Sequence, residues 1–206
     1  MRVALIEDDA AVLDSLRLYL KRQGVTADCF PTADEFLAAG KPAVRQYDCV
    51  IADVRMPGVS GLDLVRHFAA EAIDVPTILI TGHGDIGMAV TAIKDGAFDF
   101  IEKPFDESRL LESIQNAVKT ERRKLDDAAE LADLEARLAQ LSERQRQVMA
   151  LAVAGLSNKD IGQRLRISFR TVEVHRAWMM NKMGARNLAE LVRMGMQLKS
   201  QLLTPR

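Results

Sequence analysis

The sequence predicts an α/β domain built on a five-stranded parallel sheet, followed by a helical linker and a small all-α domain. Five short apolar runs alternate with helical patterns in the first ~120 residues, which is typical of strands joined by crossover helices. The charge then changes sign. Residues 1–141 contain 16 Lys and Arg against 25 Asp and Glu, whereas residues 142–206 contain 12 against 4. We therefore expect two domains with different partners.

Five apolar runs are the predicted strands of the sheet. They are VALIE, VTADCF, YDCVIAD, PTILIT and FDFIEK, at residues 3–7, 25–30, 47–53, 76–81 and 98–103. The short stretches between them suit right-handed crossovers, with helices on both faces of the sheet. Such open sheets bind ligands beyond the carboxyl ends of their strands, so the functional residues of this domain are expected there.

Polar and charged residues lie at the ends of four predicted strands. The first strand ends in Glu7 and Asp8, the third in Asp53, the fourth in Thr81 and the fifth in Lys103. Three carboxylates in one crevice would repel one another unless a divalent cation lay among them, and Mg²⁺ prefers such oxygen ligands. The hydroxyl of Thr81 and the positive charge of Lys103 suit an anion added at Asp53.

Each of these residues also has an ordinary structural interpretation. Thr81 could cap the next turn, Lys103 could be a solvated charge, and Glu7 and Asp8 could be acidic residues that favour a helix N-terminus. Five such residues at matching strand ends, in order along the chain, favour a common site instead.

The segments LIEDD, IADVRMPGVSG, ILITGHGD and FDFIEKPF resemble the receiver domain of two-component response regulators, which has a flavodoxin-like fold. The resemblance implies that Asp53 accepts a phosphoryl group from a sensor histidine kinase. It also implies that Mg²⁺ is held by Glu7, Asp8, Asp53 and the carbonyl of Arg55. Asp8 with Asp9 is an alternative acidic pair, but Asp9 is better placed to cap the helix that follows it.

The same resemblance implies roles for three further residues. Thr81 and Lys103 would contact the phosphoryl oxygens, and Phe100 would be the aromatic switch residue. The resemblance also implies a cis peptide between Lys103 and Pro104, and cis peptides are essentially confined to bonds that precede proline.

Residues 121–141 contain no Pro or Gly and are rich in helix formers, so they predict a helix. Leu131, Leu134, Leu138 and Leu141 follow the 3-4-3 spacing of heptad a and d positions. A heptad and a half is too short to hold two chains together by itself. Three alternatives stay open: a helical extension packed on its own domains, a short dimeric coiled coil, and a flexible linker.

The basic C-terminal segment carries a helix-turn-helix pattern among four predicted short helices. LSERQ predicts a capping box, in which Ser142 caps a helix and Gln145 reaches back to it. Residues 158–165 predict a short helix and RIS a tight turn. A longer basic helix is expected to start at Ser168 and to run to about Met183.

This longer helix has two predicted faces. Val172, Met179 and Met183 lie on the side expected in the core. The opposite side mixes a cation, an acceptor and small apolar groups, which suits the reading of base edges, and flanking cations would grip phosphates. Such charges ordinarily belong to a solvated surface, but the excess of basic residues and the tight turn between the helices favour DNA binding. The expected DNA contacts are Lys159, Arg170, Thr171, Glu173, Val174, Arg176, Ala177 and Lys182.

The C-terminal segments LSERQRQVMALAVAGLSNKDIGQRL and SFRTVEVHRAWMMNKM resemble the LuxR-type DNA-binding domain of the FixJ/NarL family, FixJ subgroup. The resemblance implies a transcription regulator, not an enzyme. Its implied partners are double-stranded promoter DNA and RNA polymerase, and it would form a homodimer on phosphorylation. The predicted domains are residues 1–120 for the receiver, 121–141 for the helical linker and 142–206 for the helix-turn-helix domain.

Other classes of protein fit the sequence less well. No apolar run approaches ~18 residues, and acidic residues follow the N-terminus too soon for a signal peptide, so a cytoplasmic protein without a membrane partner is expected. Cys29 and Cys49 lack CxxC spacing and are expected to be buried apolar residues. A phosphatase of the haloacid-dehalogenase kind would need an aspartate at the position of Arg55. A receiver that acts only as an interaction module would not account for the basic C-terminal domain.

Overall fold

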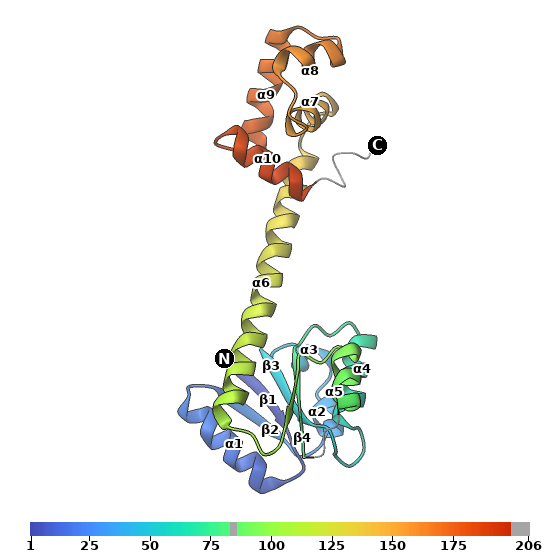
Figure 1. Ribbon diagram of the computed structural model, residues 1–206, viewed down its shortest axis with the longest axis vertical. Helices are drawn as coiled ribbons and strands as arrows, with labels where there is room; N and C mark the ends of the chain where they lie inside the picture. The colour runs from blue at the N-terminus through green and yellow to red at the C-terminus, as the bar shows by residue number, and fades with distance from the viewer. Residues whose placement is uncertain (83–85, 199–206) are drawn as a thin grey trace. The chain divides into compact units, whose positions relative to one another are not determined.

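The computed structural model describes residues 1–82 and 86–198, in two compact units, Met1–Arg123 and Lys124–Arg206 (Figure 1). Part of the TGHGD motif and the last eight residues of the predicted C-terminal domain lie outside the described residues. None of the described helices is long and apolar enough to cross a membrane.

The first unit contains a five-stranded sheet in which every neighbouring pair of strands is parallel, in the order β2-β1-β3-β4-β5. The predicted α/β fold is therefore confirmed. The strands are β1 (Arg2–Ile6), β2 (Thr26–Phe30), β3 (Cys49–Asp53), β4 (Thr77–Thr81) and β5 (Asp99–Glu102).

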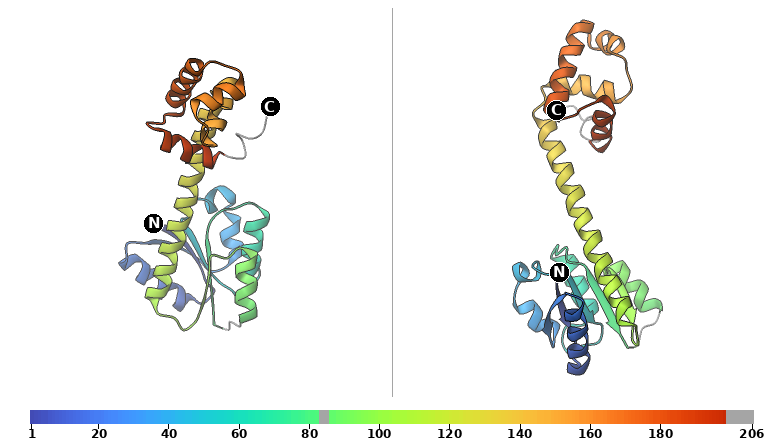
Figure 2. Two further views of the ribbon diagram at one scale, coloured as in Figure 1. Left: turned by 45° about the horizontal axis from the view of Figure 1, so that its top comes forward. Right: turned by 90° about the vertical axis from the view of Figure 1, so that its left-hand side faces the viewer.

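Helices cover both faces of this sheet because its strands alternate buried side chains between two cores. Ala4 and Ile6 of β1 belong to the core on one face, whereas Val3 and Leu5 belong to the core on the other. α1 and the first part of α6 lie on one face, and α4 and α5 lie on the other (Figure 1 and Figure 2). The helices are α1 (Ala10–Arg22), α2 (Ala33–Ala38), α3 (Lys41–Val44), α4 (Gly61–Ala70), α5 (Ile86–Asp95) and α6 (Glu107–Ala139).

The two cysteines lie in the first unit and are both free. Cys49 is buried on β3, and burial raises the pKa of its thiol. Cys29 on β2 is half-buried, and burial raises the pKa of this thiol as well. The expectation of a buried apolar residue is confirmed for Cys49 and is only partly met by Cys29.

Most leucines of the predicted linker helix pack against residues of their own chain. The division between the two units falls inside α6, and the later part of this helix belongs to the second unit. Leu134, Leu138 and Leu141 are buried in the core of that unit, whereas Leu131 is 39% exposed. A coiled-coil dimer would need the same three side chains, so a helical extension packed on its own domain accounts for them.

Up to residue 198, the second unit adds four short helices, as the sequence predicts. The Ser142 side chain accepts a hydrogen bond from the backbone N–H of Gln145, and the Gln145 side chain accepts one from the Ser142 N–H, which confirms the capping box. Ser168 caps the longer helix. The helices are α7 (Glu143–Val153), α8 (Asn158–Leu165), α9 (Phe169–Met183) and α10 (Leu188–Gln197).

Candidate functional site

The acidic residues predicted to hold a metal lie together at the carboxyl ends of β1 and β3. Ile6 pairs with Ala52, so the residues that follow β1 lie beside Asp53 at the end of β3. One ligand oxygen from each of Glu7, Asp8 and Asp53 lies within 4.8 Å of the other two. Octahedral Mg²⁺ places its ligand oxygens about 3 to 4 Å apart, so a small movement of these side chains fits the ion.

Asp9 is not part of this cluster because its carboxylate has another partner. It caps α1, and its Oδ1 accepts hydrogen bonds from the backbone N–H groups of Ala11 and Val12 at 2.9 and 3.3 Å. The choice of Glu7 with Asp8 as the acidic pair therefore agrees with the geometry, and the predicted cap is confirmed.

Lys103 joins the acidic cluster from the end of β5. Its ammonium donates hydrogen bonds to Oε2 of Glu7 at 2.7 Å and to Oδ2 of Asp53 at 2.5 Å. Burial raises the pKa of Glu7 and the charge of Asp53 raises it further, although the hydrogen bond from Lys103 opposes this. Burial alone would lower the pKa of Lys103, but its hydrogen bonds to both carboxylates raise it. The site therefore holds a paired, largely buried ammonium beside two carboxylates.

Neighbouring backbone groups also contact Asp53 closely. The Arg55 N–H donates a 2.8 Å hydrogen bond to Oδ1 of Asp53, which fixes one carboxylate oxygen. A Cβ atom at Gly61 would lie 2.4 Å from the carbonyl oxygen of Asp53, so only glycine fits here. The sequence analysis missed Gly61, and the only signal for it is its position in the PGVSG loop.

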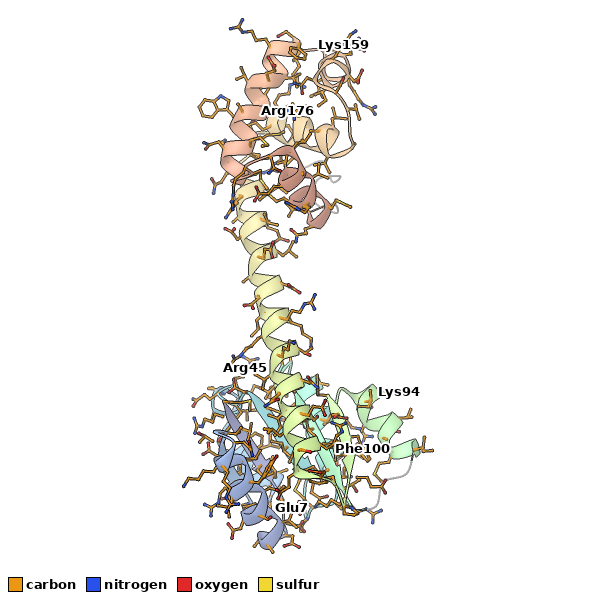
Figure 3. The ribbon with its side chains drawn as sticks, turned by 60° about the vertical axis from the view of Figure 1, so that its left-hand side comes forward. Glu7, Arg45, Lys94, Phe100, Lys159 and Arg176 are labelled. Carbon is orange, nitrogen blue, oxygen red and sulfur yellow. The ribbon has the colours of Figure 1, made fainter. Side chains whose placement is uncertain are left out.

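Thr81 and Phe100 lie on the two strands that follow β3 in the sheet. Thr81 ends β4 and is fully buried, and its carbonyl accepts a 2.7 Å hydrogen bond from the Lys103 N–H. Phe100 of β5 is half-buried and packs against the core shared with α4 and α5. Glu7 and Arg45 lie at opposite ends of the sheet, and Phe100 is labelled in the same view (Figure 3). The peptide bond between Lys103 and Pro104 is cis, as predicted.

The recognition helix expected in the second unit has the two predicted faces. Val172, Met179 and Met183 of α9 are fully buried, which confirms the core face. The residues expected to read base edges are all exposed, and the neighbouring Trp178 is 57% exposed. These exposed residues are Arg170, Glu173, Val174 and Ala177.

Other expected DNA contacts already have partners within the protein. The Lys182 ammonium donates hydrogen bonds to the carbonyl of Gln140 at 2.9 Å and to Oε1 of Gln145 at 3.2 Å. The Arg176 guanidinium donates to Oδ1 of Asn158. Lys159 is exposed on α8 and Arg176 lies on α9 (Figure 3).

Two hydroxyls meet at the start of α9. The Oγ1 atom of Thr171 lies 2.7 Å from Oγ of Ser168, which also accepts a hydrogen bond from the Thr171 N–H. Thr171 is half-buried, so it contributes to the N-terminal cap of α9 as well as to the surface around it. If Thr171 contacts DNA through its hydroxyl, that contact competes with the hydrogen bond to Ser168 in the cap.

Arg137 is a structural residue that the sequence analysis missed. Its guanidinium donates a 2.9 Å hydrogen bond to the carbonyl of Met183, at the end of α9, and pairs with Asp133 at 2.6 Å. Together with Lys182, it ties the end of α6 to the end of α9. The only sequence signal was the i,i+4 spacing of Asp133 and Arg137, which says nothing about the partner in α9.

Comparisons with known protein families agree with both units. Residues 3–115 match the response regulator receiver domain, and residues 139–195 match bacterial regulatory proteins of the luxR family.

Known proteins resemble the chain over almost its whole length. It is 44% identical to the transcriptional regulatory protein FixJ of Bradyrhizobium diazoefficiens, over 95% of this chain and 94% of that protein. The structure of the response regulator StyR matches with a TM-score of 0.77 and 36% identity, over 95% of this chain and 98% of StyR. Full-length FixJ from B. japonicum matches with a TM-score of 0.59 and 42% identity, over 97% of each chain.

Proposed function

The chain belongs to the response-regulator family, as a FixJ-like transcription regulator with a receiver domain and a LuxR-type DNA-binding domain, and on this premise we propose that phosphorylation of Asp53 controls DNA binding. The observation that carries the proposal is the ammonium of Lys103, which contacts both Glu7 and Asp53. A fixed positive charge beside a buried carboxylate suits a group that gains further negative charge.

The proposed reaction is phosphoryl transfer from a histidine of a sensor kinase. A carboxylate oxygen of Asp53 attacks the phosphorus, the P–N bond to the histidine breaks, and the imidazole leaves and takes up a proton. Glu7, Asp8, Asp53 and the carbonyl of Arg55 would hold Mg²⁺, which would neutralise charge on the transferred group. Thr81 and Lys103 would contact its oxygens.

The added phosphoryl group would change the surface formed by α5 and β5. It brings roughly −1.5 to −2 charge and three acceptor oxygens, toward which the Thr81 hydroxyl can turn. Phe100 then turns into the space left under the loop that follows β4. Apolar side chains of α5 are already exposed, with Ile86 at 86%, Val90 at 47% and Ile93 at 50%, so this helix suits a self-complementary dimer surface.

Dimerisation would bring two α9 helices to one promoter. Half-sites about 10 base pairs apart would then be read by the exposed face of each helix, and Lys159 would contact phosphates. A coupling of ~1 to 3 kcal/mol shifts a monomer–dimer equilibrium by about 5- to 150-fold. We expect such a regulator to act in the cytoplasm, with RNA polymerase as a further partner at the promoter.

Labelling by a small phosphodonor, such as acetyl phosphate with Mg²⁺, tests the phosphoacceptor. We expect the wild-type protein to be labelled and Asp53→Asn to remain unlabelled. Asp48→Asn is the matched control, because Asp48 precedes the same strand at its opposite end. Full labelling of Asp53→Asn would place the acceptor elsewhere.

A further inference from the structure

A shallow pocket lies at the turn of the helix-turn-helix in the second unit. It has a volume of about 330 Å³ and is formed by one side of α8 and by the residues that lead into α9. α8 contributes Lys159, Gly162 and Gln163, and the turn with the first residue of α9 contributes residues 166–169. The pocket therefore adjoins the beginning of the recognition helix, outside the face expected to read bases.

Two cations line this pocket, one from α8 and one from the residue that follows the helix. Lys159 lies in the first turn of α8 and Arg166 is the residue that follows its last turn, and both line the same pocket. Ile161 lies on the face of α8 opposite to Lys159, in the core. Both cations are exposed, and among the residues that the structure describes neither side chain has a hydrogen bond or an ion pair.

The backbone of Arg166 is unusual for an arginine. Arg166 ends α8 with φ 55° and ψ 45°, in the left-handed region where glycine is the favoured residue. The turn is also tight, because a Cβ at Gly162 would lie 2.9 Å from the carbonyl of Ile167. A residue other than glycine in the left-handed region costs stability, and such outliers are concentrated at functional sites.

Two other cations of the predicted DNA surface are less available, because each is paired within the protein. Arg176 donates to Asn158, and Lys182 donates to Gln140 and Gln145. Lys159 and Arg166 have no such partner among the described residues, and they present their charges to solvent beside Phe169, which is 53% exposed. A convergent pair of exposed cations in a pocket is complementary to an anionic group of phosphate size.

We propose that this pocket binds a phosphate of the DNA backbone next to the major groove occupied by α9, with Arg166 and Lys159 as its cations. The proposal rests on the proposed DNA binding and names a contact that the sequence analysis did not include. Arg166 would join Lys159 as a second cation that contacts the backbone from this pocket. Because phosphate contacts carry no base information, the pocket should strengthen binding to every sequence alike.

The test is a salt titration of the binding of full-length protein, treated with beryllofluoride and Mg²⁺, to a short mixed-sequence duplex. We expect Arg166→Gln to weaken binding about tenfold and to reduce the slope of log K against log salt by about one. Arg166→Lys keeps the charge and should retain most of both. Arg164→Gln is the matched control, since Arg164 is exposed on α8 but does not line the pocket.

Arg166→Gly separates a binding role from a structural one. Glycine is the favoured residue in the left-handed conformation, so this variant should melt no lower than the wild type and yet bind DNA as weakly as Arg166→Gln. The inference is overturned if the Arg166 variants bind with unchanged affinity and salt slope, or if Arg164→Gln has the same effect. A wild-type protein that binds no duplex would instead overturn the proposed function.

Discussion

The ammonium of Lys103 lies 2.5 Å from Oδ2 of Asp53, although the two residues are fifty positions apart in the chain. The contact joins the end of β5 to the proposed phosphoacceptor at the end of β3. Glu7 accepts a second hydrogen bond from the same ammonium. A change of charge at Asp53 therefore acts directly on the residue that follows β5.

Lys103→Met should destabilise the first unit when Mg²⁺ is absent. Without the ammonium, Glu7 and Asp53 are two neighbouring carboxylates with little solvent, and we expect a loss of about 1 to 3 kcal/mol in the free energy of unfolding. Mg²⁺ should restore more stability to this variant than to the wild type. Urea unfolding with and without Mg²⁺ measures both effects, with the exposed Lys94→Met as control. Equal responses of the two variants to Mg²⁺ would contradict the expectation.

Thr81→Ala should separate phosphorylation from its consequence. The variant keeps Asp53 and Lys103, so it should still be labelled by a phosphodonor, but it lacks the hydroxyl that turns toward the phosphoryl group. Sedimentation with beryllofluoride and Mg²⁺ should show mostly monomer, whereas Thr81→Ser should still form dimers. A Thr81→Ala protein that dimerises like the wild type would remove Thr81 from the proposed switch.

Glu173→Ala should change which sequences are bound, because a carboxylate on the exposed face of α9 can accept a hydrogen bond from a base edge. We expect specificity at one base pair to relax, at a cost of ~1 to 3 kcal/mol for the preferred site. Lys159→Ala should weaken all sites alike. Binding to a panel of single-base variants of a selected site measures the difference. Uniform losses in both variants would show that this division of roles is wrong.

Lys182→Met and Arg137→Met should each lower the stability of the second unit by about 1 kcal/mol, since each removes charged hydrogen bonds at a partly exposed position. Urea unfolding and amide exchange of α9 measure the loss, and Arg193→Met on α10 is the exposed control. A Lys182→Met protein with unchanged stability but uniformly weaker DNA binding would support the phosphate contact predicted from the sequence.

The sequence was sufficient to predict the site residues at the strand ends and the residues that cap helices. Apolar runs locate the strands, and the parallel order brings their ends together, so Glu7, Asp53 and Lys103 could be assigned to one site from the order of the residues alone. Asp9 and Ser142 were predicted as caps because the capping interaction is local, between residues two or three positions apart.

Contacts between residues distant in sequence could not be predicted in the same way. Lys182 donates to a carbonyl 42 positions away and Arg137 to a carbonyl 46 positions away, and helical periodicity does not reveal such partners. The spacing of Leu134 and Leu138 is the same whether they pack within one chain or between two. The need for glycine at position 61 follows only from the close approach of the Asp53 carbonyl.

The central claim is that modification of Asp53 controls DNA binding by the second unit. Its most direct test is the affinity of wild-type and Asp53→Asn protein for a duplex selected from a random-sequence pool, with and without beryllofluoride and Mg²⁺, with sedimentation in parallel. We predict that the wild type dimerises and binds about 5- to 150-fold more tightly with the mimic, while Asp53→Asn changes in neither respect. Equal affinity of the wild type in both conditions, or an Asp53→Asn variant that responds as the wild type does, would contradict the account.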